Sequence, residues 1–188
     1  VYLHLFLDGR DTSPSSGERY LEELLEVTGQ VGIGTIATVM GRYYAMDRDK
    51  RWDRLQRAHR ALVEGEGYRA EDPRAAVRRS YRQKVMDEFV EPIVLVDLNG
   101  KPMGCIEDGD TVIFFNFRSD RAREITSSLT CEDFSGFERS KFPRVHYVCF
   151  TEYDERFDLP VAFPSHDLTN ILAEERTKLI QDLLKKAG

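Results

Sequence analysis

The sequence predicts an α/β fold in which a largely parallel sheet is flanked by helices, with one small β-hairpin. Short apolar runs rich in strand-forming residues alternate with longer segments whose apolar residues recur every three or four positions. Glycine, proline, aspartate and serine separate most of these segments, as is typical of turns and helix ends. With 188 residues, 41% of them hydrophobic, the chain is long enough to build one domain with its own core.

The first part of the chain predicts a strand, a helix and a second strand. Residues 1–7, VYLHLFL, form an apolar run that stops at an Asp-Gly pair, which favours a buried strand. Ser13-Pro14 is typical of an N-cap followed by proline in the first helical turn, and the helix that it predicts ends at Gly29. Residues 33–40 predict the second strand.

Two helices and the hairpin are expected next. Apolar residues at spacings of three and four predict a helix from Lys50 to about Glu64, and Asp72-Pro73 predicts the start of another. The segments 91–96 and 103–106 lie on either side of an Asn-Gly pair. That arrangement is typical of a hairpin with a tight turn.

The last part of the chain predicts two more strands and two more helices. Residues 111–117 form the most apolar strand, Ser119 is expected to cap a helix, and 145–150 predict a further strand. Beyond them, leucines recur at the spacing of an amphipathic helix. We therefore expect one domain over residues 1–166 and an amphipathic helical tail over residues 167–188.

Composition excludes several classes of protein. The formal net charge of −6 disfavours a general nucleic-acid binder, and no apolar run reaches the ~18 residues that a membrane span needs. No signal peptide opens the chain, and its three cysteines show no metal-binding spacing, so we expect a cytoplasmic protein without disulfides or a metal site. The chain starts without methionine, which we interpret as a cut or processed piece of something longer.

Arginine is unusually common, with 20 residues against 7 lysines, and its positions are informative. Arginines follow the carboxyl ends of three predicted strands, the edge at which open α/β sheets bind ligands. We expect five of them to converge on one crevice: Arg10, Arg42, Arg48, Arg118 and Arg121.

Two interpretations of this cluster remain open. Neighbouring aspartates could pair with any single arginine and merely fix its loop. Taken together, the arginines favour a cradle for a small anion that carries phosphate or carboxylate, because the guanidinium fork matches both groups. Asp11 is the aspartate best placed to bind a ligand hydroxyl and to act as an acid or base.

Several long strings resemble the cofactor-independent phosphoglycerate mutases. They include FLDGRDT (residues 6–12), GRYYAMDRDKRW (41–52), DEFVEP (87–92), DGDTVIFFNFRSDRARE (108–124) and TEYD (151–154). The resemblance covers roughly residues 1–166. It implies an enzyme that interconverts 3-phosphoglycerate and 2-phosphoglycerate in glycolysis and gluconeogenesis. Such an enzyme has a phosphatase domain, which holds two manganese ions and a serine nucleophile, and a phosphotransferase domain that binds substrate.

By this resemblance the chain is the phosphotransferase domain. The substrate contacts carried over are Arg10, Asp11, Arg42, Arg48, Arg118 and Arg121, with Asp11 handling the glycerate hydroxyls. The implied partners are the two phosphoglycerates and the phosphatase domain of the same polypeptide, with no nucleic acid and no membrane. We expect no cofactor in this chain, because the manganese ions belong to the phosphatase domain, and no turnover by the chain alone. The alternative is a stand-alone anion-binding or regulatory module that kept the fold but not the activity.

Overall fold

A computed structural model of the chain describes residues 1–164, and the tail expected over 167–188 lies outside the described residues. The described part divides into two compact units. The first contains residues 1–110 and 121–145, and the second contains residues 111–120 together with the chain from His146 onward. Each unit is described below by itself.

The first unit is built on a four-stranded sheet with the order β1-β2-β4-β3. The strands are β1 (Tyr2–Leu7), β2 (Thr35–Gly41), β3 (Tyr68–Ala70) and β4 (Ile93–Leu95). Strands β1 and β2 are parallel, as are β3 and β4, whereas β2 and β4 are antiparallel. The prediction of an α/β fold with a largely parallel sheet is therefore confirmed, although its centre contains one antiparallel pairing.

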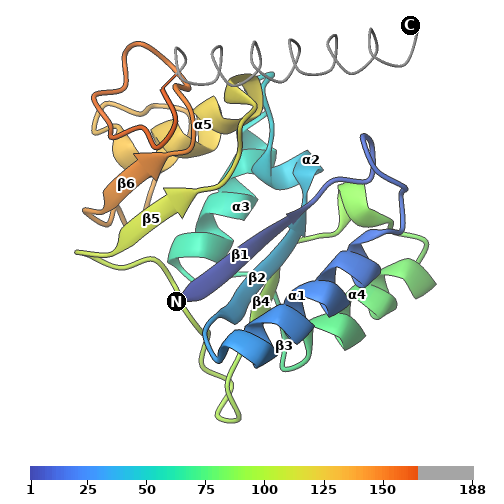
Figure 1. Cartoon of the computed structure of the whole chain (residues 1–188). Coiled ribbons are helices and arrows are strands. Elements are labelled where there is room, and N and C mark those ends of the chain that lie inside the picture. The colour runs from blue at the N-terminus through green and yellow to red at the C-terminus, as the bar shows by residue number, and fades with distance from the viewer. Residues whose placement is uncertain (165–188) are drawn as a thin grey trace, which may run out of the picture. The chain divides into compact units, whose positions relative to one another are not determined.

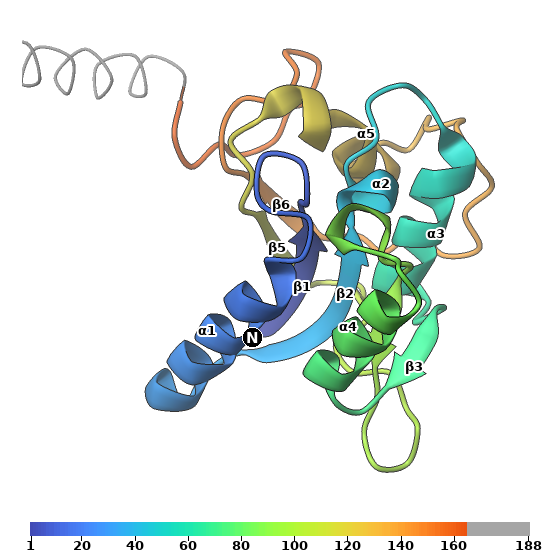
Figure 2. The same cartoon turned by 90° about the vertical axis from the view of Figure 1, so that its right-hand side faces the viewer.

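Helices cover both faces of this sheet (Figure 1). Helices α1 (Gly17–Val31) and α4 (Pro73–Arg82) lie side by side on one face, and α3 (Trp52–Val63) lies on the other (Figures 1 and 2). Leu21 of α1 and Val77 of α4 form a core with Ile93 and Leu95, which alternate along β4. Period-two alternation in the strand and helical spacing in α1 and α4 thus produce a single apolar layer.

Helix boundaries show which local signals the chain uses. At α4 the carboxylate of Asp72 accepts hydrogen bonds from the backbone N–H groups of Arg74 and Ala75, and Pro73 occupies the first helical position, as expected. At α1 the helix begins at Gly17 rather than at Ser13-Pro14, because the Ser16 N–H closes a separate turn on the Ser13 carbonyl. The short helix α2 (Arg42–Ala45), directly after β2, was not predicted.

The expected hairpin is present in a reduced form. Strand β4 continues into a tight turn in which the Asp97 N–H donates to the Lys101 carbonyl at 2.9 Å. Its return arm makes one antiparallel bridge, between Val96 and Pro102, before the chain leaves the sheet. The remaining short element of this region is η1 (Asp87–Phe89), a single 3-10 turn.

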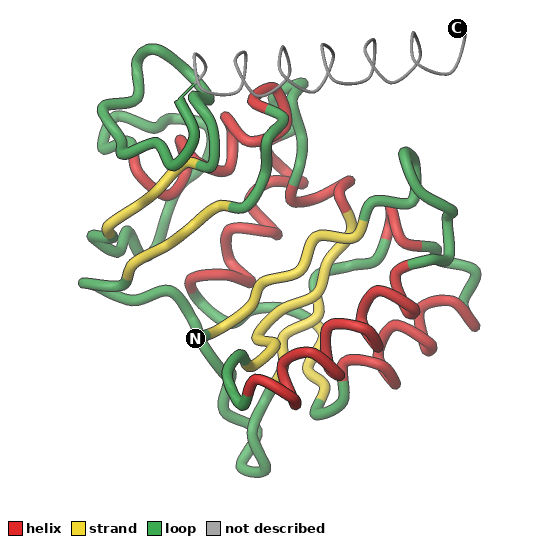
Figure 3. Tube along the Cα trace, viewed as in Figure 1, coloured by secondary structure: helices red, strands yellow, loops and turns green. Residues whose placement is uncertain are grey.

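The second unit contains a two-stranded parallel sheet of β5 (Thr111–Phe114) and β6 (His146–Cys149) (Figure 3). Helix α5 (Ser119–Thr130) starts in this unit, and its residues from Arg121 onward belong to the first unit. No helix within residues 1–164 is long and apolar enough to cross a lipid bilayer. Because β5 lies in a sheet separate from β1 and β2, sheet topology alone does not bring its loop to theirs.

Candidate functional site

Two of the predicted arginine loops meet at one edge of the first sheet. Strands β1 and β2 are parallel neighbours, and their last residues, Leu7 and Gly41, lie opposite each other. The loop after β1 carries Arg10 and Asp11, and Arg42 follows directly after β2. The strand-end argument therefore holds for these two loops.

Arg42 is the buried centre of this cluster. It is 4% exposed, and its guanidinium pairs with the carboxylates of Asp8 and Asp11, with 3.1 Å from Nη1 to Asp11 Oδ2. Burial opposes a charge on Arg42, but the hydrogen bonds that it donates to both carboxylates outweigh burial and raise the arginine's pKa. Burial likewise opposes ionisation of Asp8, whose pKa is nevertheless lowered by Arg42 and by two backbone N–H groups. Arg42 and Asp8 thus stabilise each other's charged forms.

Arg10 and Asp11 are the solvent-facing members of the cluster. Their side chains are 60% and 64% exposed, respectively. Arg10 Nη1 lies 3.6 Å from Glu88 Oε1. Around Arg10 and Arg42 stand the carboxylates of Asp8, Asp11 and Glu88, so this cluster by itself carries no surplus of positive charge. Arg10 therefore needs arginines outside this cluster beside it to give a net attraction for an anion.

Turn η1 fixes the geometry of both loops. A Cβ on Gly41 would lie 2.1 Å from the Glu88 carbonyl oxygen, and one on Gly9, whose φ is +68°, would lie 2.8 Å from the Glu88 N–H nitrogen. Asp87 is fully buried and accepts hydrogen bonds from the Gly17 N–H, at 2.8 Å, and from the Tyr81 hydroxyl. Burial raises the pKa of Asp87 above its ordinary value, against the opposing effect of these hydrogen bonds.

Sequence reasoning assigned no role to this turn. The string DEFVEP supported the family resemblance, but nothing in its composition indicated that Asp87 and Glu88 would lie beneath two distant loops. The available signal was the pair of glycines at the ends of β1 and β2, since glycine at such a position often marks a close approach of another backbone.

Arg48 and Arg121 are associated with a different loop, residues 46–51, which joins α2 to α3. Arg48 is exposed in this loop, and Arg121 Nη1 on α5 donates to the Met46 carbonyl at 2.9 Å. Asp47 is 4% exposed and accepts hydrogen bonds from the N–H groups of Asp49 and Arg51, at 3.0 and 2.8 Å. Asp47 therefore orients the loop.

Arg118 belongs to the second unit. Its N–H donates to Asn116 Oδ1 at 3.0 Å, and its Nη2 lies 3.5 Å from Asp120 Oδ2. The Tyr153 hydroxyl contacts the carbonyl oxygens of Phe114 and Asn116 at 2.8 and 2.6 Å, which fixes the backbone just before Arg118. Of the predicted residues, the first unit thus brings together Arg10, Asp11 and Arg42, places Arg48 and Arg121 at the 46–51 loop, and does not contain Arg118.

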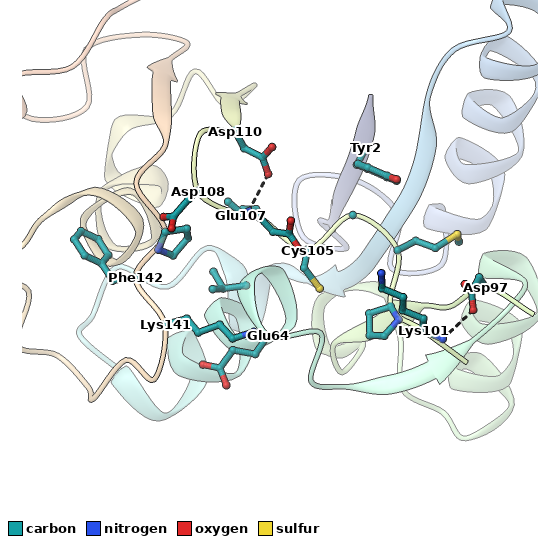
Figure 4. Close-up of a pocket in the computed structure, with 16 residues that line it drawn as sticks. Tyr2, Glu64, Asp97, Lys101, Cys105, Glu107, Asp108, Asp110, Lys141 and Phe142 are labelled. Carbon is teal, nitrogen blue, oxygen red and sulfur yellow. Dashed lines mark hydrogen bonds between the residues drawn. The ribbon is translucent and has the colours of Figure 1, made fainter. Parts of the chain in front are cut away.

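A polar cavity of about 820 Å³ lies at the other end of β1, beside Tyr2 (Figure 4). Its acidic lining residues are Glu64, Asp97, Glu107, Asp108 and Asp110, against the two cations Lys101 and Lys141. This balance repels phosphate and carboxylate groups, so the cavity is not the anion site expected from the sequence. Within residues 1–164 no group of three His, Cys, Asp or Glu side chains is arranged to hold a metal ion.

Comparisons with known proteins give a consistent result. Residues 1–155 match the family model described as the BPG-independent PGAM N-terminus. The 2,3-bisphosphoglycerate-independent phosphoglycerate mutase of Methanococcoides burtonii is 48% identical over 179 residues, which are 95% of this chain and 35% of that protein. The Moorella thermoacetica enzyme of the same name is 51% identical over 175 residues, 93% of this chain and 34% of its own length.

A solved structure agrees with these sequence matches. The Leishmania mexicana phosphoglycerate mutase, crystallised at low cobalt concentration, superposes with a TM-score of 0.78 at 36% identity, covering 82% of this chain and 30% of that one. The chain thus spans about a third of the length of the relatives that it matches. The match over 179 residues is longer than the 166 residues in which we noted the resemblance, so aligned sequence reaches into the expected tail.

Proposed function

Because the chain belongs to the BPG-independent phosphoglycerate mutase family and corresponds to its N-terminal family segment, we propose that it supplies the phosphoglycerate-binding half of a phosphoglycerate mutase active site. The whole enzyme would interconvert 3-phosphoglycerate and 2-phosphoglycerate. This chain would hold the glycerate while a phosphatase domain of the same polypeptide transfers the phosphate.

The observation that carries the proposal is the Arg42–Asp11 pair at the carboxyl end of β1. Asp11 is mostly exposed, yet a buried guanidinium fixes one of its carboxylate oxygens. A carboxylate held in this way at a ligand-binding edge can accept a hydrogen bond from a glycerate hydroxyl and take up or return its proton. Arg42 then acts on the ligand through Asp11, rather than as the direct clamp that the sequence suggested.

Positive charge for the substrate's phosphate and carboxylate would come from the more accessible arginines. These are Arg10, Arg48, Arg118 and Arg121. The acidic neighbours of Arg10 and Arg42 lower the net attraction of the first cluster, which supports weak binding of phosphoglycerate by the chain alone. The two manganese ions implied by the family resemblance would be held by the phosphatase domain and would activate its serine there.

Titration calorimetry with 3-phosphoglycerate tests the substrate assignment. We expect saturable binding by the wild-type chain and at least a tenfold loss of affinity in Arg10→Ala and in Arg118→Ala. Arg144→Ala is the matched control, because Arg144 forms an exposed ion pair with Glu132 outside both loops. Equal affinity in all four proteins, or binding in none, would contradict the assignment.

A turnover assay tests the proposal that this chain supplies only half of the active site. The purified chain, incubated with 3-phosphoglycerate and Mn²⁺, should form no 2-phosphoglycerate, because no serine nucleophile is assigned to it. Sustained turnover that scales with protein concentration would show that the chain is a complete enzyme and would overturn this part of the proposal.

A further inference from the structure

The 46–51 loop is a tightly bonded turn between α2 and α3. Asp47 Oδ2 accepts the N–H groups of Asp49 and Arg51, and Lys50 adopts a left-handed backbone conformation with φ of +57°. A lysine rarely takes this conformation, so the surrounding contacts must stabilise it. The loop is therefore held in one shape by a small number of hydrogen bonds.

Helix α5 holds the loop at both of its ends. Arg121 donates to the Met46 carbonyl at the start, and Glu124 Oε1 accepts the Lys50 N–H at 2.9 Å near the end. These two side chains are three residues apart and therefore project from one face of α5. The loop that exposes Arg48 is thus fixed by the same helix face that carries Arg121.

The second oxygen of Glu124 is unusual. Oε2 is buried and, within the described part of the chain, accepts no hydrogen bond. The carboxylate of Asp47 lies against the Glu124 carboxyl, and two ionised carboxylates cannot hydrogen-bond to each other. A proton on either oxygen removes the repulsion and creates a carboxyl–carboxylate hydrogen bond.

Two other charged groups lie close to this pair, Arg54 and Asp49. Arg54 on α3 lies 3.9 Å from Asp47 Oδ1, but its guanidinium stacks on the Tyr43 ring, 3.8 Å from the centroid. Asp49 in the loop adds negative charge near Glu124. Burial is the largest cause that raises the pKa of Glu124, which rises to about 7, and the charges of Asp47 and Asp49 act in the same direction.

We propose that Glu124 is a positioning residue of the anion site, and that its protonated carboxyl donates to Asp47 and locks the loop that presents Arg48. The role of Arg48 toward the anion depends on the proposed function. The hydrogen bond from protonated Glu124 to Asp47, called the lock below, does not depend on it. Loss of the proton puts two negative charges in contact. The ionised carboxylate is a stronger acceptor for the Lys50 N–H, but the repulsion between Glu124 and Asp47 drives the two side chains apart and loosens the loop. Phosphoglycerate affinity should consequently fall as the pH rises through about 7.

Three variants distinguish the protonated and ionised states of the Glu124–Asp47 pair. Glu124→Gln keeps an oxygen for the Lys50 N–H and offers an amide donor to Asp47, so it imitates the protonated form at every pH. Glu124→Ala removes both contacts. Asp47→Asn removes the facing charge and gives ionised Glu124 a donor, so in that variant the Glu124 carboxyl should titrate at a lower pH than in the wild type.

Carboxyl ¹³C NMR titration and hydrogen exchange, corrected for intrinsic rates, measure the lock directly. In the wild type we expect the Glu124 carboxyl to titrate near pH 7 and the Lys50 amide to lose at least tenfold protection between pH 6 and pH 8. Glu124→Gln should keep its protection at both pH values, and Glu124→Ala should lack it at both. Titration of Glu124 at its ordinary value, or the same loss in Gln as in Ala, would overturn the proposal.

Calorimetry then connects the lock to the anion site. Wild-type affinity for 3-phosphoglycerate should fall about tenfold from pH 6 to pH 8, relative to the fall measured in Glu124→Gln. An equal fall in both proteins would refute the positioning role even if the NMR titration confirmed the shared proton. If no protein binds 3-phosphoglycerate while Glu124 and Lys50 behave as expected, the proposed function fails and the lock stands.

Discussion

Arg42 donates a hydrogen bond from Nη1 to Asp11 Oδ2 at 3.1 Å. The Arg42 side chain is almost inaccessible to solvent, whereas the Asp11 side chain is mostly exposed. The guanidinium is held in place by protein on all sides, whereas the carboxylate faces solvent. A rigid donor behind an accessible acceptor reduces the number of orientations that the carboxylate can adopt. This relationship orders the loop after β1, in which the neighbouring Arg10 side chain stays exposed.

Replacement of Arg42 by alanine should lower both stability and affinity. Asp8 would lose its buried partner, and because Asp11 is largely exposed we expect a loss of about 2–3 kcal/mol in the free energy of unfolding, below the ~3–5 kcal/mol typical of fully buried pairs. Urea denaturation measures this change. Arg42→Lys should recover part of the stability but not the affinity for 3-phosphoglycerate, because the lysine ammonium lies at a different reach from the backbone than Nη1, the atom that contacts both carboxylates.

Arg19→Ala provides the matched control for Arg42→Ala. Arg19 and Glu23 form an exposed i,i+4 pair on α1, with side chains 66% and 61% exposed, and such pairs contribute about 0.3–0.5 kcal/mol. Equal losses in Arg42→Ala and Arg19→Ala would show that the buried pair contributes no more than a surface contact.

Two glycine-to-alanine substitutions test whether turn η1 determines the position of the loops. Gly41 has φ of −75° and ψ of 153°, which alanine adopts readily, so any cost is steric. Its new Cβ would lie 2.1 Å from the Glu88 carbonyl oxygen, whereas a Cβ on Gly29 of α1 meets nothing within 4 Å. We expect Gly41→Ala to lower the free energy of unfolding by at least about 2 kcal/mol and Gly29→Ala to raise it by about 0.5–1 kcal/mol.

Chemical denaturation of both glycine variants, followed by circular dichroism, measures these opposite effects. If Gly41→Ala is too unstable to purify, its soluble yield beside that of Gly29→Ala gives the same ranking. A Gly41→Ala protein as stable as the wild type would mean that η1 moves away at little cost, and that it does not fix Gly9 and Gly41.

Local pattern predicted the elements of this fold better than it predicted their pairing. The apolar run VYLHLFL corresponds to β1, and Asp72-Pro73 starts α4, because both signals act within a few residues. The separate sheet of β5 could not be anticipated, because the strands that pair with each other are far apart in sequence. The apolar run 111–117 ends as a strand at Phe114, and Phe115 and Phe117 are 81% and 73% exposed.

In the candidate site, too, the residues placed by local pattern were predicted, and the contacts between distant segments were not. Arg10, Asp11 and Arg42 were predicted as site residues because their strands end at one edge, and the structure places both loops there. Their role as site residues stays a prediction. The side chains that hold the loops in place were not predicted, because each forms its hydrogen bond with a residue far away in the sequence. These hydrogen bonds join Asp87 to Gly17, Glu124 to Lys50, and Tyr153 to Asn116. Residue type alone does not distinguish such a support from an ordinary surface acid or a core tyrosine.

The stability of the chain should depend on pH through His59. This ring is fully buried between α3 and α5, with Nδ1 3.3 Å from Ser128 Oγ, and burial lowers its pKa from 6.5 to about 4. The folded protein therefore binds this proton less tightly than the unfolded chain. The resulting contribution to stability is fully present above pH 6.5 and is lost as the pH falls toward 4, amounting to about 3 kcal/mol at the acid limit.

His59→Leu isolates this contribution. The Ser128 hydroxyl still donates to the Ile125 carbonyl at 2.8 Å, so the substitution leaves no unsatisfied donor behind.

Two other groups also make stability depend on pH. His4, whose pKa is also lowered to about 4 by burial, acts in the same direction as His59, whereas Glu124, with its raised pKa, acts in the opposite direction up to about pH 7. Both remain in the variant, so they cancel in the difference between the two unfolding free energies measured by urea titration from pH 4 to pH 7. That difference should increase with pH in favour of the wild type and level off above pH 6.5. A difference that does not depend on pH would show that His59 is protonated equally in the folded and unfolded states.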